Sequence, residues 1–205
     1  MTSMADLRDP DTPLPAPALD QLFREARTYA EWRDKPVNPE TLQTLYDLLR
    51  LGPTSANCCP ARFVFVATPA GKESLRPHLA KGNVEQTMSA PCTVIVAYDP
   101  RFYEKMPTLY RQADMKAYFS KDPDFTYENA LRNGSLQGAY LILAARSLGL
   151  DCGPMSGFNN KTLDETFFAE TGWKSNFLCN LGYGRKDSLT PRNTRLSFKE
   201  ACRVA

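Results

Sequence analysis

The sequence contains one histidine, and its cysteines lack the spacing of a metal site. His78 stands beside Pro77 with no second histidine anywhere in the chain, so we expect a packing or surface residue rather than a catalytic base or metal ligand. Of six cysteines only Cys58 and Cys59 lie close together, and no C-x-x-C occurs. A structural zinc site is therefore not expected, and we interpret the cysteines as mostly reduced, buried, apolar residues.

Long hydrophobic segments are also missing. The longest apolar run, near residues 140–145, stops at Arg146, and the N-terminus carries charged residues in place of an apolar core. We therefore expect no membrane span and no targeting segment, and a cytoplasmic location. Lys and Arg total 25 against 23 Asp and Glu, spread along the chain, so nothing indicates a nucleic-acid partner.

Three common enzyme signatures are absent. The sequence has no G-x-G-x-x-G, no Walker A motif and no G-x-S-x-G, so it supports neither a Rossmann dinucleotide domain nor these other classes. What remains is an ordinary globular composition of 205 residues, with 42% apolar and 23% charged residues. We predict a disordered, proline-rich tail over 1–17 and one domain over 18–205, of which 185–205 form an extended C-terminal arm.

Hydrophobic periodicity predicts an α+β fold. Apolar residues at helical spacing alternate with short β-prone apolar runs. The predicted helices begin near residues 18, 38, 71, 128 and 160, and the predicted strands begin near residues 63, 92, 150 and 174. Residues 101–127 are rich in aromatics and weakly periodic. They form either a lid over a pocket or an excursion that packs its rings on the body.

The stretch from Gly52 to Arg62 separates a predicted helix from a predicted strand. Its Thr, Ser and Asn side chains offer hydroxyls and an amide on a rigid support, which suits a flat, polar-edged ligand. Taken alone, the same composition is also typical of a helix end followed by a surface turn.

This stretch resembles a known signature. Residues 53–61 resemble P-S-x-x-N-x-Q-P-W, the flavin-binding segment of the FMN-dependent nitroreductase family, with Cys59 in place of Gln and Ala61 in place of Trp. Arg27 and Thr28 resemble part of that family's phosphate-binding opening, although Ala26 and Ala30 stand where cations are usual. Residues 153–158 resemble a third family segment, and the similarity runs from about Leu19 to the C-terminus.

The resemblance implies a nitroreductase-like fold, with a central mixed or antiparallel sheet flanked by helices. It also implies an intertwined homodimer with the long helix at the subunit interface, where the small residues at 134, 135, 138 and 139 would let another helix approach. The implied cofactor is FMN, reduced by NADH or NADPH in a ping-pong reaction with a small-molecule acceptor.

The resemblance also implies individual site residues. Main chain at Ser156 and Gly157 would pass the flavin N5, Asn57 would bind the polar edge of the ring, and Arg27 and Arg195 would share the phosphate. The full set of expected cofactor-binding residues is Arg27, Thr28, Pro53, Thr54, Ser55, Asn57, Pro154, Met155, Ser156, Gly157 and Arg195.

The acceptor is the least constrained feature. The chain is similar to a subgroup of the family that reduces malonic semialdehyde to 3-hydroxypropionate in pyrimidine degradation, and Arg111 and Arg132 are candidate cations for the substrate carboxylate. The alternative is broad reduction of quinones and nitroaromatics. A hypothesis outside the enzyme class is a non-enzymatic flavin-binding protein or a redox switch built on Cys58 and Cys59.

Overall fold

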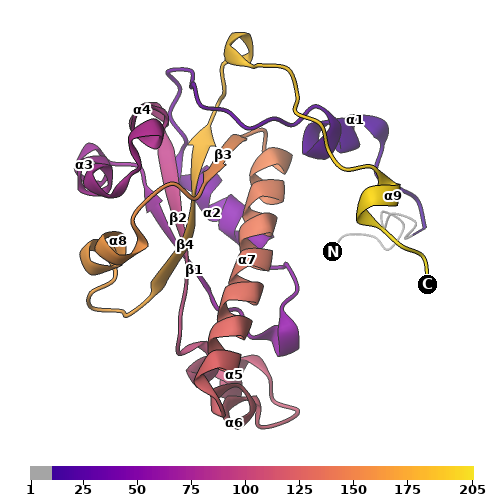
Figure 1. Cartoon of the computed structure of the whole chain (residues 1–205), viewed down its shortest axis with the longest axis vertical. Coiled ribbons are helices and arrows are strands. Elements are labelled where there is room, and N and C mark those ends of the chain that lie inside the picture. Colours follow the sequence, from indigo (N-terminus) through magenta and orange to yellow (C-terminus); the bar gives the residue numbers. More distant parts are fainter. Residues whose placement is uncertain (1–10) are drawn as a thin grey trace, which may run out of the picture.

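The computed structural model describes residues 11–205 and places a four-stranded antiparallel sheet at the centre of this part of the chain (Figure 1). The strands are β1 (Ala61–Val66), β2 (Cys92–Tyr98), β3 (Asp151–Met155) and β4 (Lys174–Gly182), in the order β1-β2-β4-β3. The α+β fold predicted from periodicity is confirmed.

Helices connect the strands and cover the sheet. Their bounds are α1 (Ala16–Leu19), α2 (Pro39–Leu49), α3 (Pro69–Leu75), α4 (Val84–Ser89), α5 (Met106–Leu109), α6 (Met115–Ser120), α7 (Pro123–Ser147), α8 (Asn160–Phe167) and α9 (Phe198–Ala201). The π-helical turn Asp20–Arg24 extends α1. Helix α7 begins five residues earlier than the sequence pattern indicated. Asp122 caps the Phe125 amide, and Pro123 occupies the first helical position, where its missing N–H costs nothing.

Of the tail predicted over 1–17, residues 1–10 lie outside the described part of the chain. Helix α1 already begins at Ala16, two residues before the predicted start of the domain. Proline is compatible with the first turn of a helix, which explains how a proline-rich segment starts one.

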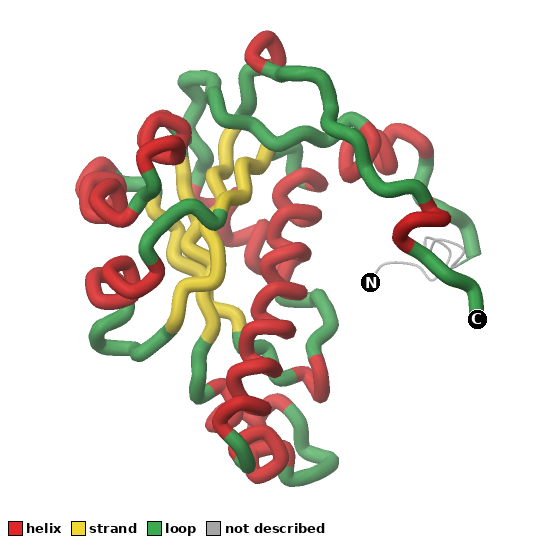
Figure 2. Tube along the Cα trace, viewed as in Figure 1, coloured by secondary structure: helices red, strands yellow, loops and turns green. Residues whose placement is uncertain are grey.

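The sheet separates two apolar layers, which Figure 2 shows as helices on either side of the strands. On one face Leu45 and Leu49 of α2 and Leu141 of α7 pack on alternate strand residues such as Val94. On the other face α3 and α8 cover the intervening residues, including Ile95. Every residue of β2 is buried, as expected for a strand covered on both faces.

The glycines of α7 face the sheet. A Cβ on Gly138 would lie 2.6 Å from the Phe177 ring, and one on Gly134 would lie 3.3 Å from the Tyr98 Cβ. The small size of these two glycines therefore serves contact with the protein's own sheet, whereas Ser135 and Ala139, the other small residues of this helix, are exposed on its outer side. Leu136 and Tyr140 remain 47% and 38% exposed on the outer side of α7.

The C-terminal segment runs beside α1, away from the sheet, as Figure 1 shows. Residues 190–205 are all exposed. Arg192 Nη2 donates to the Arg24 and Ala26 carbonyls, both at 2.8 Å, so the segment is held to the chain beyond α1. It ends in α9, whose start is fixed by a capping box between Ser197 and Glu200.

Several further expectations can be compared with the described residues. His78 is buried and its Nδ1 lies 2.8 Å from Thr162 Oγ1, which confirms a packing role. All six cysteines are free. Within residues 11–205 no helix is long and apolar enough to cross a membrane, and no cluster of His, Cys, Asp and Glu is arranged to hold a metal ion.

Candidate functional site

The first group of predicted residues gathers at β3. The Tyr29 amide donates to the Cys152 carbonyl at 3.1 Å, and Thr28 forms a parallel bridge with Cys152. A Cβ at position 153 would lie 2.5 Å from the Tyr29 carbonyl oxygen, so only glycine permits this approach. The Arg27–Thr28 segment is thereby fixed along the free edge of the sheet.

Gly153 and Pro154 both lie within β3, although glycine and proline usually weaken or interrupt a strand. Pro154 is tolerated because β3 is an edge strand, where a residue without an N–H removes no ladder bond toward a neighbouring strand. The irregular backbone begins one residue beyond the strand, at Ser156.

Ser156 and Gly157 form a turn in which both carbonyls accept hydrogen bonds, while both backbone N–H groups lack an acceptor within residues 11–205. The Gly157 carbonyl accepts from the Ala80 amide at 2.9 Å and from Asn83 Nδ2 at 2.8 Å, while the Ser156 carbonyl accepts from the Phe158 amide. Neither the Ser156 nor the Gly157 N–H donates to another residue within 11–205. The turn therefore offers two fixed hydrogen-bond donors to a ligand.

Asn83 and Gln86 support this turn, and the sequence reasoning did not select either residue. Gln86 Nε2 donates to Asn83 Oδ1 at 2.6 Å, and the Gln86 carbonyl accepts from Trp32 Nε1 and Asn180 Nδ2. The sequence signal for Asn83 was weak, because an Asn after Gly is typical of any surface turn. Only the fold brings it to Gly157.

Arg27 and Arg195 lie on two segments that run past each other. Arg27 Nη2 donates to the Thr190 carbonyl at 2.6 Å, whereas Arg195 Nη1 donates to the carbonyls of Asn193 and Thr194. No hydrogen bond or ion pair joins the two guanidiniums to a common group within the described chain. The C-terminal segment therefore brings Thr190, rather than Arg195, into contact with Arg27.

The second group is the loop Pro53–Asn57, which rests on α7 and α5. The Ser55 amide donates to Asn133 Oδ1 at 2.8 Å, and Asn57 Nδ2 donates to the Leu109 carbonyl at 3.1 Å. Ala56, Asn57 and Cys59 all have positive φ, at 46°, 54° and 41°. Such conformations cost about 1–3 kcal/mol each and persist only where surrounding contacts impose them, often at ligand-binding loops.

Cys59 and Thr54 close this loop on itself. The Cys59 amide donates to Thr54 Oγ1 at 3.1 Å, and the Cys59 thiol donates to Asn57 Oδ1 at 3.3 Å. Burial raises the pKa of Cys58 to about 12, so that its thiol stays protonated at neutral pH. The hydrogen bond from Cys59 orients the Asn57 amide. Cys58 is unreactive because its thiol stays protonated.

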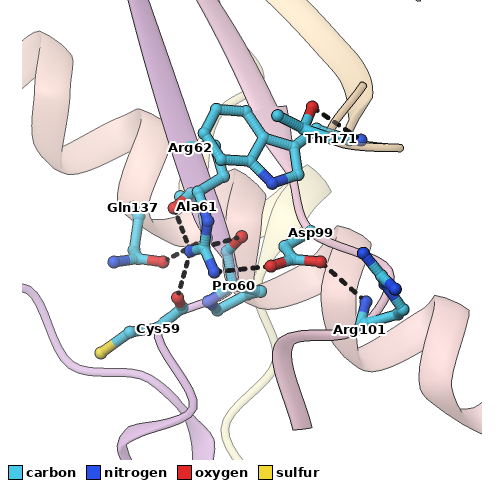
Figure 3. A network of polar contacts seen from close by, with 9 residues as sticks. Cys59, Pro60, Ala61, Arg62, Asp99, Arg101, Gln137 and Thr171 are labelled. Carbon is cyan, nitrogen blue, oxygen red and sulfur yellow. Dashed lines mark hydrogen bonds and ion pairs between the residues drawn. The ribbon is translucent and has the colours of Figure 1, made fainter. Parts of the chain in front are cut away.

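Arg62 fixes the end of the loop where β1 begins (Figure 3). Its guanidinium donates to the carbonyls of Cys59, Pro60 and Ala61 and pairs with Asp99 at 2.8 Å. The Ala61 amide donates to Gln137 Oε1 on α7 at 2.9 Å. The loop is thus anchored at both ends to the rigid body of the protein.

The two groups lie far apart within one chain. The loop is held by Asn133, whereas the Thr28–Cys152 bridge lies by Ile142, whose carbonyl faces the Cys152 thiol. Nine residues of α7 separate these contacts, or about 14 Å along the helix axis. The turn at Gly157 also packs against residues of the opposite, α4 side of the sheet.

The two candidate substrate cations differ in their surroundings. Arg132 is exposed on α7 and paired with Glu128. Arg111 is exposed in the segment after α5, two residues beyond the Leu109 carbonyl that holds Asn57, and its guanidinium has no partner within residues 11–205. Both arginines thus lie near residues that hold the loop, Arg132 next to Asn133 and Arg111 near Leu109, but only Arg111 has an uncompensated charge.

Comparison with known proteins shows the family of this chain. Residues 23–183 match the model of the Nitroreductase family. The chain belongs to the nitroreductase family. It is 55% identical to a Stutzerimonas stutzeri protein named "Putative NADH dehydrogenase/NAD(P)H nitroreductase", over 94% of this chain and 98% of that protein. A Stenotrophomonas maltophilia protein of the same name is 58% identical, with the same two coverages.

Solved structures show the nitroreductase fold. A nitroreductase-type protein from Exiguobacterium sibiricum, in complex with FMN, superimposes with a TM-score of 0.82 at 21% identity, covering 95% of this chain and all of that one. One from Bacillus subtilis gives 0.83 at 20% identity, covering 91% and 98%. The predicted nitroreductase-like fold of this family member is confirmed.

Proposed function

We propose that this nitroreductase-family protein is an FMN-dependent NAD(P)H oxidoreductase. The observation that carries the proposal is the Ser156–Gly157 turn. Its two backbone N–H groups have no acceptor within residues 11–205, and the Gly157 carbonyl is held by hydrogen bonds from Ala80 and Asn83, just before α4. Donors fixed before a ligand arrives stabilise negative charge on it without reorganisation. Relatives named for NAD(P)H activity and a structural neighbour bound to FMN support the same conclusion.

The donor set of this chain fits FMN. Thr28 is exposed with its hydroxyl unpaired within 11–205, and Arg27 uses only one terminal nitrogen for Thr190, so both retain donors for a phosphate. Arg195 is exposed and bonded only to carbonyls of its own segment, which a phosphate would displace readily. The amide of Asn57 can both donate to and accept from a planar ring edge.

Bound FMN would supply hydride transfer between NAD(P)H and an acceptor. The chain's own residues position the ring and tune its surroundings. The Ser156 and Gly157 amides present donors, Asn83 holds their turn in place, and Cys59 orients the Asn57 amide. No side-chain acid or base is required in this group, which accords with the absence of a suitably placed histidine.

We further propose that a second copy of the chain completes the site. The loop at Asn57 and the group at Gly157 are held on different layers of one chain, too far apart to contact one flavin ring. A homodimer in which each site takes its loop from one protomer and its turn from the other removes this separation. The uncovered outer side of α7, with Leu136 and Tyr140, supplies apolar area for the contact.

Mixing two variants tests both proposals. Asn57→Leu and Arg27→Ala should each weaken FMN binding by roughly ten- to a hundredfold. The two variants are unfolded and refolded together and assayed at an FMN concentration too low to fill the weakened sites; half of the dimers are then mixed, and each mixed dimer has one site with both native halves. Up to about a quarter of the wild-type NAD(P)H-dependent flavin reduction should then return.

Controls separate the two proposals. No recovery on mixing, with wild-type protein that refolds fully, means that both halves come from one chain and removes the shared-site proposal only. Colourless protein with no FMN affinity, or yellow protein that NADH and NADPH fail to bleach, removes the oxidoreductase proposal itself. Riboflavin binding as tightly as FMN would refute the phosphate roles of Arg27 and Arg195.

For the acceptor we propose malonic semialdehyde, with Arg111 as the cation for its carboxylate. The support is the position of Arg111 beside the Asn57 loop and its lack of a carboxylate partner, in contrast to Arg132. Arg111→Ala should therefore raise KM for malonic semialdehyde about tenfold or more while leaving a neutral aldehyde of similar size unaffected. Arg132→Ala is the matched control and should change neither.

The competing acceptor class is quinones and nitroaromatics, and the relatives carry "NAD(P)H nitroreductase" in their names. An exposed flavin face suffices for these substrates, with no dedicated cation. Equal rates with charged and neutral aldehydes, or turnover of the quinone alone, would favour this class and reject the semialdehyde. A redox switch built on Cys58 and Cys59 requires both thiols, so it predicts that Cys59→Ser is insensitive to a thiol oxidant. Reversible loss of activity in that variant on oxidant treatment would reject the switch.

A further inference from the structure

A cavity of about 520 Å³ lies where β2 ends and β4 begins, beside the first turns of α7. This volume falls within the range of about 300–1,000 Å³ typical of small-molecule sites. Six of the lining residues carry the argument: Tyr98, Arg101, Tyr103, Ser120, Tyr127 and Lys174. None of the lining residues belongs to the groups assigned above to flavin or acceptor.

The walls of the cavity suit a flat ring. The rings of Tyr98 and Tyr127 meet edge to face, with centroids 6.2 Å apart and planes at 69°. Tyr103 adds a third aromatic side chain from the segment after β2. Aromatic rings favour such edge-to-face and offset contacts with a further ring, which a flexible aliphatic chain cannot reproduce.

The polar groups of the cavity favour a negative charge. The Arg101 guanidinium makes no ion pair or hydrogen bond with any residue of 11–205. Lys174 Nζ lies 3.8 Å from Asp164, a carboxylate that already accepts from the Ser175 amide. Two cations at one cavity, against one engaged carboxylate, leave net positive charge facing it.

Tyr98 supplies a hydroxyl donor. Its side chain is largely buried but lines the cavity, and its hydroxyl has no hydrogen-bond partner in the described chain. Burial, with smaller effects of Tyr127 and Asp164, raises the pKa of Tyr98 to about 12, so the phenol keeps its proton at neutral pH. The hydroxyl is therefore available to donate a hydrogen bond to a ligand in the cavity.

We infer that this cavity binds a planar aromatic carboxylate. The ring packs against Tyr98, Tyr103 and Tyr127, while the carboxylate accepts hydrogen bonds from Arg101 and Lys174. The inference is independent of flavin binding, because no residue is shared between the two sites.

Calorimetry on the intact, FMN-supplemented protein tests the site, with 2-naphthoate as the probe. We expect saturable binding at one site per chain, and at least tenfold weaker binding of 2-naphthol, which has the same rings without the charge. Arg101→Ala and Lys174→Ala should each weaken 2-naphthoate binding about tenfold. The control Lys161→Ala removes an exposed lysine of α8 outside the cavity and should have no effect.

Three results would overturn the inference. The first is equal affinity for 2-naphthoate and 2-naphthol. The second is binding that Arg101→Ala and Lys174→Ala leave unchanged but Asn57→Leu abolishes, which would place the probe at the loop. The third is the absence of any binding up to millimolar 2-naphthoate in protein whose circular dichroism is native.

Discussion

Lys72 of α3 is buried without a carboxylate partner, and its titration should be visible in the stability of the protein. The residue is 6% exposed, and its Nζ donates to the Thr87 carbonyl at 2.7 Å and to Thr93 Oγ1 at 2.6 Å. Burial lowers the pKa of Lys72 from 10.5 to about 8, against a small opposing effect of Cys92. The ammonium is therefore less favourable in the folded protein than in the unfolded chain.

The sign and size of the effect follow from linkage. Below pH 8 both states are protonated and the folded state carries the whole penalty, roughly 3 kcal/mol at 1.36 kcal/mol per pKa unit. Between pH 8 and 10.5 the unfolded chain binds more protons than the folded protein, so the free energy of unfolding rises with pH. From pH 7 to pH 9 the contribution of Lys72 should rise by about 1 kcal/mol.

Other groups act in the opposite direction at higher pH. The pKa values of Cys58 and Tyr98 are raised to about 12 by burial, so above about pH 9 their ionisation in the unfolded chain lowers stability. A comparison with Lys72→Met, measured only up to pH 9, removes these shared contributions. Lys161→Met, at an exposed site on α8, controls for the loss of one positive charge.

The assay is urea unfolding followed by circular dichroism at pH 7, 8 and 9, with FMN at fixed excess. The stability of the wild type relative to Lys72→Met should increase by about 1 kcal/mol over this interval, while relative to Lys161→Met it should stay constant. A flat difference between the wild type and Lys72→Met would show that Lys72 is not a titrating group with a depressed pKa, and a falling difference would reverse the sign of the argument.

Two further predictions concern packing around the loop and α7. Arg62→Met removes the guanidinium from the mostly buried Asp99 carboxylate, which keeps only the Arg101 amide as a donor, and from the Cys59 carbonyl. It should lower the free energy of unfolding by about 3–5 kcal/mol, whereas exposed Arg50→Met should have little effect in the same urea titration. Gly138→Ala places a methyl 2.6 Å from the Phe177 ring of β4 and should lower the free energy of unfolding by about 1–3 kcal/mol. Gly82→Ala, with open space at its Cβ, should lower it by less than about 1 kcal/mol. Equal losses in the two variants would show that α7 does not pack closely on the sheet.

The strands and longer helices could be predicted from the sequence because their residues respond to local rules. The run from Cys92 to Tyr98 is apolar at every position except Thr93, and it becomes a strand buried on both faces. Pro39 at the first helical position marks the start of α2 through proline geometry, which needs no knowledge of distant residues, although the Asn38 side chain makes no capping hydrogen bond. The motif at residues 53–61, together with the segments at 27–28 and 153–158, likewise indicated the family from the sequence alone.

The tertiary structure alone decided how these parts meet. Asn83 acquires its importance from a contact 74 residues away in the chain, and no local pattern encodes a partner at that distance. Gly138 faces the sheet rather than another helix because the register of α7 on β4 turns it that way. The depressed pKa of Lys72 requires a dry environment assembled from three elements, and sequence reasoning treats a lysine as exposed.

The placement of the site shows the same division. Arg27, Asn57 and Gly157 each carry a chemical type that the sequence displays, but their separation depends on the order of strands and on the layer in which each segment packs. Side-chain chemistry is a property of one residue, so the sequence determined it. Distance between groups is a property of the folded chain, because it depends on contacts between residues that no periodicity connects.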